Sequence, residues 1–208
     1  MPKKQPSKPN VYAFIDSQNL NLGVQKFGWK LDWRKFRKFL HDKYNVTQAY
    51  MFIGYMPDYE SLYTQMHDAG YLVVLKPTLD MYSTPIDKDQ SAHAAQHNAQ
   101  PTTTTSDTKE PADEPKKPAT KGNVDAELVL YAMKELANYD KAIIVSGDGD
   151  FYCIVEYLEQ QGKLLHLMAP NWKYSSLLKP YEKYVVRVDE FKRQLAYKSF
   201  KRSVKSQQ

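Results

Sequence analysis

The chain has 208 residues, which suits one domain with short extensions, and its hydrophobic content of 42% with 16 tyrosines is sufficient for a buried core. No stretch approaches the roughly 18 apolar residues that span a bilayer, and the lysine-containing N-terminus lacks the apolar segment of a signal peptide. A single cysteine, Cys153, excludes an internal disulfide. These features predict a cytoplasmic protein with no membrane partner.

The formal net charge of +5 comes from the two ends of the chain. Residues 1–10 carry three lysines and residues 191–208 carry six basic residues, and neither segment contains an acid, so residues 11–190 carry about −4. Basic tails around a mildly acidic body suit a protein whose tails hold a polyanion while an acidic pocket holds a metal. Tails that only aid solubility are the alternative.

The first part of the chain alternates apolar strands with amphipathic helices. The expected elements are a strand over 11–15, a helix over 33–44, a strand over 46–53, a helix over 58–69 and a strand over 71–75. Asp32 is placed to cap the first helix, and Gly70 is placed to end the second. This alternation favours a parallel sheet with helical crossovers.

The alternation stops between Ser83 and Thr120, where no aromatic residue occurs and prolines, threonines, alanines and charges accumulate. Such a composition cannot bury enough apolar surface to offset the entropy of ordering the chain. Residues 83–120 are therefore predicted to be a disordered insertion. The alternation resumes afterwards, so the insertion lies inside the domain and is not a boundary.

The later elements complete an α/β pattern. They are a helix over 124–139, a strand over 142–145, a helix over 151–161, a strand over 163–168, a short helix over 175–181, a strand over 184–188 and a basic C-terminal helix capped by Asp189. The predicted fold is a three-layer α/β/α domain over residues 11–190, with five to six mostly parallel strands. A basic tail over 1–10 precedes it, and a basic helix or tail over 191–208 follows it.

Four acids lie at or beside element boundaries. Asp16 closes a strand in FIDSQN, Asp148 and Asp150 follow a strand in IIVSGDGDF, and Asp125 lies in the first turn of a helix in KGNVDAELVL. The carboxyl ends of adjacent parallel strands meet at one edge of a sheet, so these acids are expected to meet there. Their repulsion and desolvation are relieved by a hard cation with oxygen ligands. The pattern therefore predicts an Mg²⁺ or Mn²⁺ site.

Each acid taken alone also has a structural interpretation. Asp16 suits a helix N-cap or an Asx turn, Asp148 and Asp150 suit a β-turn or a helix cap, and Asp125 is favoured by the helix dipole. Asn19 follows Asp16 at the turn, where its amide can hold a carboxylate or contact a phosphate.

The glycines beside two of these acids suggest a backbone that approaches a ligand. Gly147 and Gly149 in SGDGDF allow a tight turn that brings backbone amides close to a bound group. A metal bound by the acids suits hydrolysis of a phosphodiester, because it activates water and stabilises charge on the attacking and leaving oxygens.

Other chemistries are poorly supported by the sequence. The five histidines show no paired zinc spacing, and no GxSxG, GxGxxG or GK[ST] motif occurs. Cys153, among apolar neighbours on a helix, is interpreted as an inert core thiol.

The segments FIDSQNL, KGNVDAELVL and VSGDGDF, in this order and beside these elements, resemble the NYN family, the LabA-like branch of the PIN-like nuclease fold. The resemblance covers roughly residues 11–188 apart from the insertion. It implies a PIN-like Rossmannoid sheet and a metal-dependent ribonuclease that acts on RNA, expected to be single-stranded. The catalytic and metal-binding acids that it implies are Asp16, Asp125, Asp148 and Asp150, and the substrate-binding residues are Asn19, Ser146, Lys76 and Lys121.

A second class of function stays open beside the enzyme. The same cleft and the basic tails suit a non-catalytic module that binds RNA or regulates it. The intact acids favour the nuclease, because a binding module gains nothing from four carboxylates that repel one another at a phosphate site.

Overall fold

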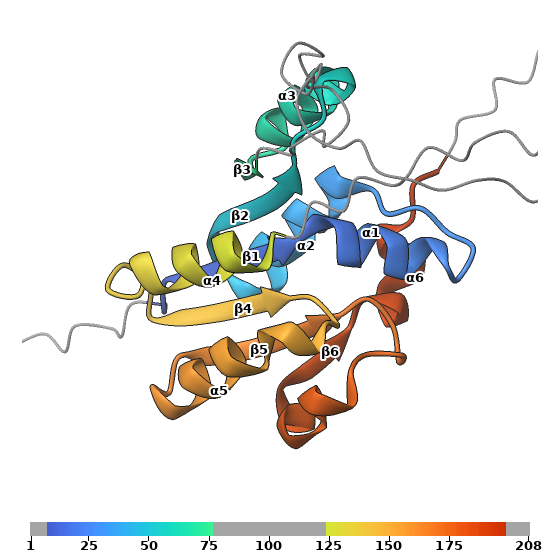
Figure 1. Cartoon of the computed structure of the whole chain (residues 1–208). Helices are drawn as coiled ribbons and strands as arrows, with labels where there is room; N and C mark the ends of the chain where they lie inside the picture. The colour runs from blue at the N-terminus through green and yellow to red at the C-terminus, as the bar shows by residue number, and fades with distance from the viewer. Residues whose placement is uncertain (1–7, 77–123, 199–208) are drawn as a thin grey trace, which may run out of the picture. The chain divides into compact units, whose positions relative to one another are not determined.

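The computed structural model describes residues 8–76 and 124–198. Figure 1 shows a sheet with helices on both sides. Its strands are all parallel and lie in the order β3-β2-β1-β4-β5-β6. The strands are β1 (Val11–Asp16), β2 (Val46–Gly54), β3 (Leu72–Lys76), β4 (Lys141–Val145), β5 (Leu164–Ala169) and β6 (Val185–Arg187). The expected α/β/α fold with a parallel sheet is confirmed.

Six α-helices and four 3-10 helices connect the strands of the described part. The α-helices are α1 (Ser17–Gln25), α2 (Trp33–Tyr44), α3 (Glu60–Asp68), α4 (Asp125–Lys134), α5 (Tyr152–Gln160) and α6 (Lys192–Leu195). The 3-10 helices are η1 (Pro57–Tyr59), η2 (Gly149–Phe151), η3 (Ser176–Tyr184) and η4 (Val188–Phe191). None of the helices within residues 8–76 and 124–198 is both long and apolar enough to cross a bilayer.

Two hydrophobic cores lie on the two faces of the sheet, one on each face. Successive residues of a strand point to opposite faces, so Ala13 and Ile15 of β1 enter one core and Phe14 enters the other. The first core packs against α1, α2, α3 and α6, and the second packs against α4, α5 and η3. All six residues of β1 are buried, because this strand lies between two others and is covered on both faces.

The predicted caps of the first half are confirmed. The Asp32 carboxylate accepts a hydrogen bond from the backbone amide of Lys35, at 3.2 Å, and so begins α2. Gly70 takes a φ of +90° directly after α3, a backbone conformation that favours glycine.

The structure contains one helix that the sequence did not indicate, and it corrects several expectations. The chain after Asp16 enters helix α1, which the weak apolar pattern of SQNLNLGVQ does not indicate. Helix α4 ends at Lys134 and not at Tyr139, whose hydroxyl turns back to donate to the Ala132 carbonyl. Cys153 is exposed on α5 and is not a core thiol, because it lies on the face of the helix that points away from the sheet.

The C-terminal segment is packed on the domain as far as the structure describes it. Leu195 is fully buried in the first core, and Ala196 pairs with Leu31 in an antiparallel bridge. Asp189 does not cap a helix, since its carboxylate accepts two hydrogen bonds from the Arg187 guanidinium and α6 begins at Lys192. The insertion over 83–120 lies outside the described residues.

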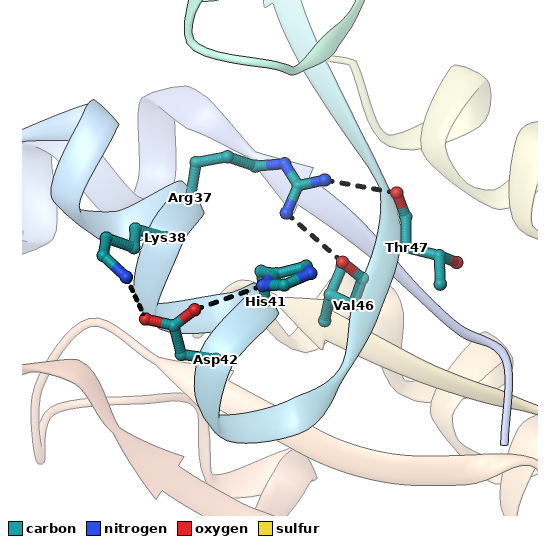
Figure 2. Close-up of polar contacts among 6 residues, drawn as sticks. All are labelled: Arg37, Lys38, His41, Asp42, Val46 and Thr47. Atoms are coloured by element: carbon teal, nitrogen blue, oxygen red, sulfur yellow. Dashed lines mark hydrogen bonds and ion pairs between the residues drawn. The ribbon is translucent and has the colours of Figure 1, made fainter. Parts of the chain in front are cut away.

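One arginine joins helix α2 to the starts of β2 and β3. Figure 2 shows the Arg37 guanidinium donating to the Val46 and Thr47 carbonyls, at 3.3 and 3.2 Å. Its Nε donates to the Gly70 carbonyl at 2.9 Å. The next residue, Lys38, instead forms an exposed ion pair with Asp42. Arg37 therefore holds three backbone segments together at the amino edge of the sheet.

We expect Arg37→Ala to lower the free energy of unfolding by roughly 1–2 kcal/mol, because three hydrogen bonds from a charged donor are lost at a partly exposed site. Lys38→Ala is the matched control and should change it by less than about 0.5 kcal/mol, since exposed ion pairs contribute little. Urea denaturation of both variants measures the difference. Equal effects of the two substitutions would show that Arg37 does not join these segments.

Candidate active site

The acids at the carboxyl edge of the sheet surround the point where the strand order reverses. From β1 the chain first adds β2 and β3 on one side, and later adds β4 to β6 on the other. In open parallel sheets, ligands bind in the crevice at this switch point. Ile15 lies opposite Val145 in the pairing of β1 with β4, so Asp16 and Ser146 follow at the same level of the two strands.

The Asp16 carboxylate is buried and accepts two hydrogen bonds. Its Oδ1 accepts from the backbone amide of Asn19 at 3.0 Å, which makes Asp16 the N-cap of α1. Its Oδ2 accepts from the Ser146 hydroxyl at 3.2 Å, a contact that is itself buried. The structural interpretation of Asp16 as an N-cap is thus confirmed, and it coexists with a position in the crevice.

Ser146 and Asn19 connect this carboxylate to the loop after β4. The Ser146 hydroxyl accepts from the backbone amide of Asp148 at 3.1 Å. The Asn19 side-chain carbonyl accepts from the backbone amide of Gly147 at 2.9 Å. Both residues therefore orient backbone and carboxylate groups at the edge of the sheet.

Burial raises the pKa of the Asp16 carboxyl from its ordinary value of 3.8 to about 6. The hydrogen bonds from Asn19 and Ser146 lower this pKa, while the negative charges of Asp125 and Asp148 raise it. Three of the four predicted acids are therefore close enough to interact electrostatically. A cation bound among them would relieve both the desolvation and the repulsion.

Asp148 and Asp150 lie on the exposed side of the loop. The Asp148 carboxylate accepts from the backbone amide of Asp150 at 3.2 Å and so caps the short helix η2. Asp148, and not Asp150, is the capping residue, because the loop turns between them. Asp150 is absent from the groups whose charge acts on Asp16.

Asp125 is the first residue of α4, and Lys76 ends β3 at the same edge of the sheet. The Lys76 ammonium lies 3.1 Å from Glu127 Oε2, in the first turn of α4. No sequence motif marks Glu127, which stands two residues after Asp125. Lys121 lies outside the described residues.

The two glycines of SGDGDF serve close packing against the protein itself. A Cβ on Gly149 would lie 2.4 Å from the Ser175 Oγ, and one on Gly147 would lie 3.2 Å from Pro170 Cδ and Tyr174 Cβ. Neither glycine has a positive φ. The two glycines therefore admit the segment between β5 and η3, and the expectation that they bring the backbone to a ligand stays a prediction.

The chemistry of the acids fits a hard divalent cation, since they offer only oxygen donors and each Asp16 oxygen keeps a lone pair beyond its hydrogen bond. No group of three or more His, Cys, Asp or Glu side chains already stands at metal-binding spacing within residues 8–76 and 124–198. The arrangement therefore provides one buried, positioned carboxylate with half-buried and exposed acids around it.

Comparison with known proteins identifies a family model and a similar fold. The model of the NYN domain matches residues 10–188. A crystal structure of a protein of unknown function from Vibrio parahaemolyticus RIMD 2210633 is similar, with a TM-score of 0.62 and 18% sequence identity. The alignment covers 93% of this chain and 100% of that chain, and at this identity it shows the fold alone. No curated protein matches the sequence.

The raised pKa of Asp16 predicts how stability depends on pH without metal. The unfolded carboxyl titrates near 3.8 and the folded one near 6, so folding is penalised increasingly as pH rises between these values. Asp16→Asn keeps an acceptor for the Asn19 amide and removes the titration. We expect its free energy of unfolding in EDTA to exceed that of the unsubstituted chain by up to roughly 3 kcal/mol near neutral pH, and by little near pH 4.

Urea denaturation across this pH range measures the difference. Asp140→Asn, which changes an exposed acid just before β4 at the opposite edge, is the matched control for the loss of one carboxylate. A difference for Asp16→Asn that stays constant with pH would contradict the burial penalty.

Proposed function

The chain belongs to the NYN domain family, and from this premise we propose that it is a metal-dependent ribonuclease that hydrolyses phosphodiester bonds in single-stranded RNA. The family suggests the PIN-like nuclease superfamily, and the fold is of that kind. Membership of the LabA-like branch and a cytoplasmic location are parts of the same proposal.

The observation that carries the proposal is the buried Asp16 carboxylate at the switch point of the sheet. It is held by hydrogen bonds from α1 and from the β4 loop, and it lies within the field of Asp125 and Asp148. A fold that only needed a helix cap could use serine or asparagine there without like-charge repulsion. The cluster of acids is better explained by a cationic ligand.

In this proposal Asp16, Asp125, Asp148 and Asp150 hold Mg²⁺ or Mn²⁺ as ligands, directly or through water. The bound ion would supply charge stabilisation at the phosphodiester and a water of lowered pKa. Above about pH 6 Asp16 is ionised and can act as a ligand, whereas at lower pH a proton competes for it.

The neighbouring polar residues position these acids and the substrate. Ser146 donates to Asp16 and orients its carboxylate, and Asn19 holds the Gly147 amide. Lys76 and Lys121 are proposed to steady the phosphate. For Lys76 this requires the ammonium to exchange part of its ion pair with Glu127 for a phosphate oxygen.

Incubation of end-labelled single-stranded RNA with the purified chain in Mn²⁺, in Mg²⁺ and in EDTA tests the activity. We expect cleavage with either metal and none in EDTA. Asp148→Asn should lower the rate by roughly a hundredfold or more, because it removes a charged group that acts at the reacting phosphate. The substitution keeps the acceptor that caps η2, so folding should be preserved.

Asp140→Asn serves again as the control and should retain full activity. RNA that binds to the chain but remains whole in both Mn²⁺ and Mg²⁺ would rule out the nuclease activity. It would favour a non-catalytic RNA-binding or regulatory module. Cleavage that survives Asp148→Asn would show that these acids are not its source.

The C-terminal tail offers a separate test of RNA binding. Removal of residues 191–208 would also take Phe191 and Leu195 from the first core, so truncation after Lys198 is the cleaner experiment. It removes Lys201, Arg202 and Lys205. We expect weaker RNA binding, with a slope of log affinity against log salt that is smaller by up to about 2. An unchanged slope, measured by fluorescence anisotropy, would assign the tail to solubility alone.

A further inference from the structure

A cavity of about 320 Å³ lies directly beside the acidic site. Asn19 and Gly147, which are hydrogen-bonded to each other, form its border with the Asp16 network. Its other walls come from the C-terminal half of α1 and the two residues after it, and from the segment that follows β5. The volume is at the lower end of the range of small-ligand pockets, which suits one nucleotide better than a longer ligand.

The two walls are firmly joined. A Cβ on Gly23 would lie 2.4 Å from Pro170 Cβ, so only glycine lets α1 approach the β5 segment this closely. Asn171 is buried and donates from its side-chain amide to the Gly23 carbonyl at 3.0 Å. Its side-chain carbonyl accepts from the backbone amide of Lys173 at 2.8 Å. The cavity is therefore preformed, with little loss of entropy left for binding.

The charge of the cavity is opposite to that of the neighbouring acids. Lys26, directly after α1, and Lys173, from the segment after β5, line it, and none of its lining residues is an acid. Neither lysine forms an ion pair within the part of the chain that the structure describes. Two lysines that line a cavity with no acid in its walls are suited to an anionic ligand.

An exposed aromatic residue lies next to the cavity in the sequence, between the lining residues Asn171 and Lys173, although it does not line the cavity itself. Trp172 is 57% exposed, and the Lys173 ammonium lies 4.9 Å from the centre of its ring. Bases of single-stranded nucleic acids stack on such rings next to cationic groups that hold the phosphates. The surface thus combines the two elements of single-strand recognition, whereas a free inorganic anion would need only the lysines.

We propose that this cavity binds the nucleotide adjacent to the cleaved bond of a single-stranded RNA. Lys26 and Lys173 hold its phosphate, and Trp172 stacks on its base. The assignment rests on the proposed nuclease function for its position relative to the reaction. The binding itself is a property of the cavity and is measurable without catalysis.

Fluorescence anisotropy of a fluorescein-labelled oligouridylate, titrated with the full chain in EDTA over a salt series, tests the cavity. Lys26→Gln and Lys173→Gln should each weaken binding roughly tenfold and reduce the salt slope by about 0.7. Lys134→Gln, an exposed lysine at the far end of α4, is the charge-matched control and should change affinity less than about twofold. Trp172→Ala should weaken binding about fivefold or more.

Lys26→Arg and Lys173→Arg guard against a general effect of substitution, because they keep the charge and should keep most of the affinity. Glutamine variants that bind like Lys134→Gln, or a chain that does not bind the RNA at all, would overturn the proposal.

The result for RNA binding is separable from the result for catalysis. Loss of binding in the lysine variants while RNA stays whole in Mn²⁺ supports the cavity and rejects the nuclease. Cleavage by the unsubstituted chain, together with lysine variants whose RNA affinity is unchanged, supports the nuclease and rejects the cavity.

Discussion

The hydrogen bonds of the Asp16 carboxylate connect the elements that meet at the carboxyl edge of the sheet. Because Asp16 is at once the last residue of the central strand and the N-cap of α1, its two oxygens join the helix to the loop after β4. Ser146 carries this connection on to the amide of Asp148. Burial of an ionised carboxylate costs desolvation free energy. Asp16 lies where ligands bind in open parallel sheets.

Three glycines allow a second segment of the chain to pack closely against the same edge of the sheet. Gly23, Gly147 and Gly149 each receive atoms of the segment between β5 and η3, at distances that leave no room for a Cβ without a shift of the neighbour. One segment of chain therefore borders both the acidic site and the basic cavity. A displacement of that segment would change both together.

The arrangement of charge follows from this geometry. Asn19 and Gly147, which are hydrogen-bonded to each other, line the cavity with the two lysines, and Asn19 also donates to the Asp16 carboxylate. A polyanion is repelled by uncompensated carboxylates and attracted by ammonium groups. On its own, the surface would hold a nucleic acid on the basic side and keep it away from the acids. In the proposed function, a divalent cation among the acids would remove that repulsion.

The sequence alone determined the fold class, the order of the strands along the chain and the candidate acids, because apolar periodicity and residues at strand ends are local properties. It placed Asp16, Asp125 and Asp148 at one edge through the rule for parallel sheets. It did not reveal α1, the exposure of Cys153 or the packing neighbours of Gly147 and Gly149. It also gave no sign of the cavity, since Lys26 and Lys173 are 147 positions apart and share no motif. Only the tertiary structure decided these, because burial, close approach and the meeting of distant side chains depend on how the elements pack and not on any one segment.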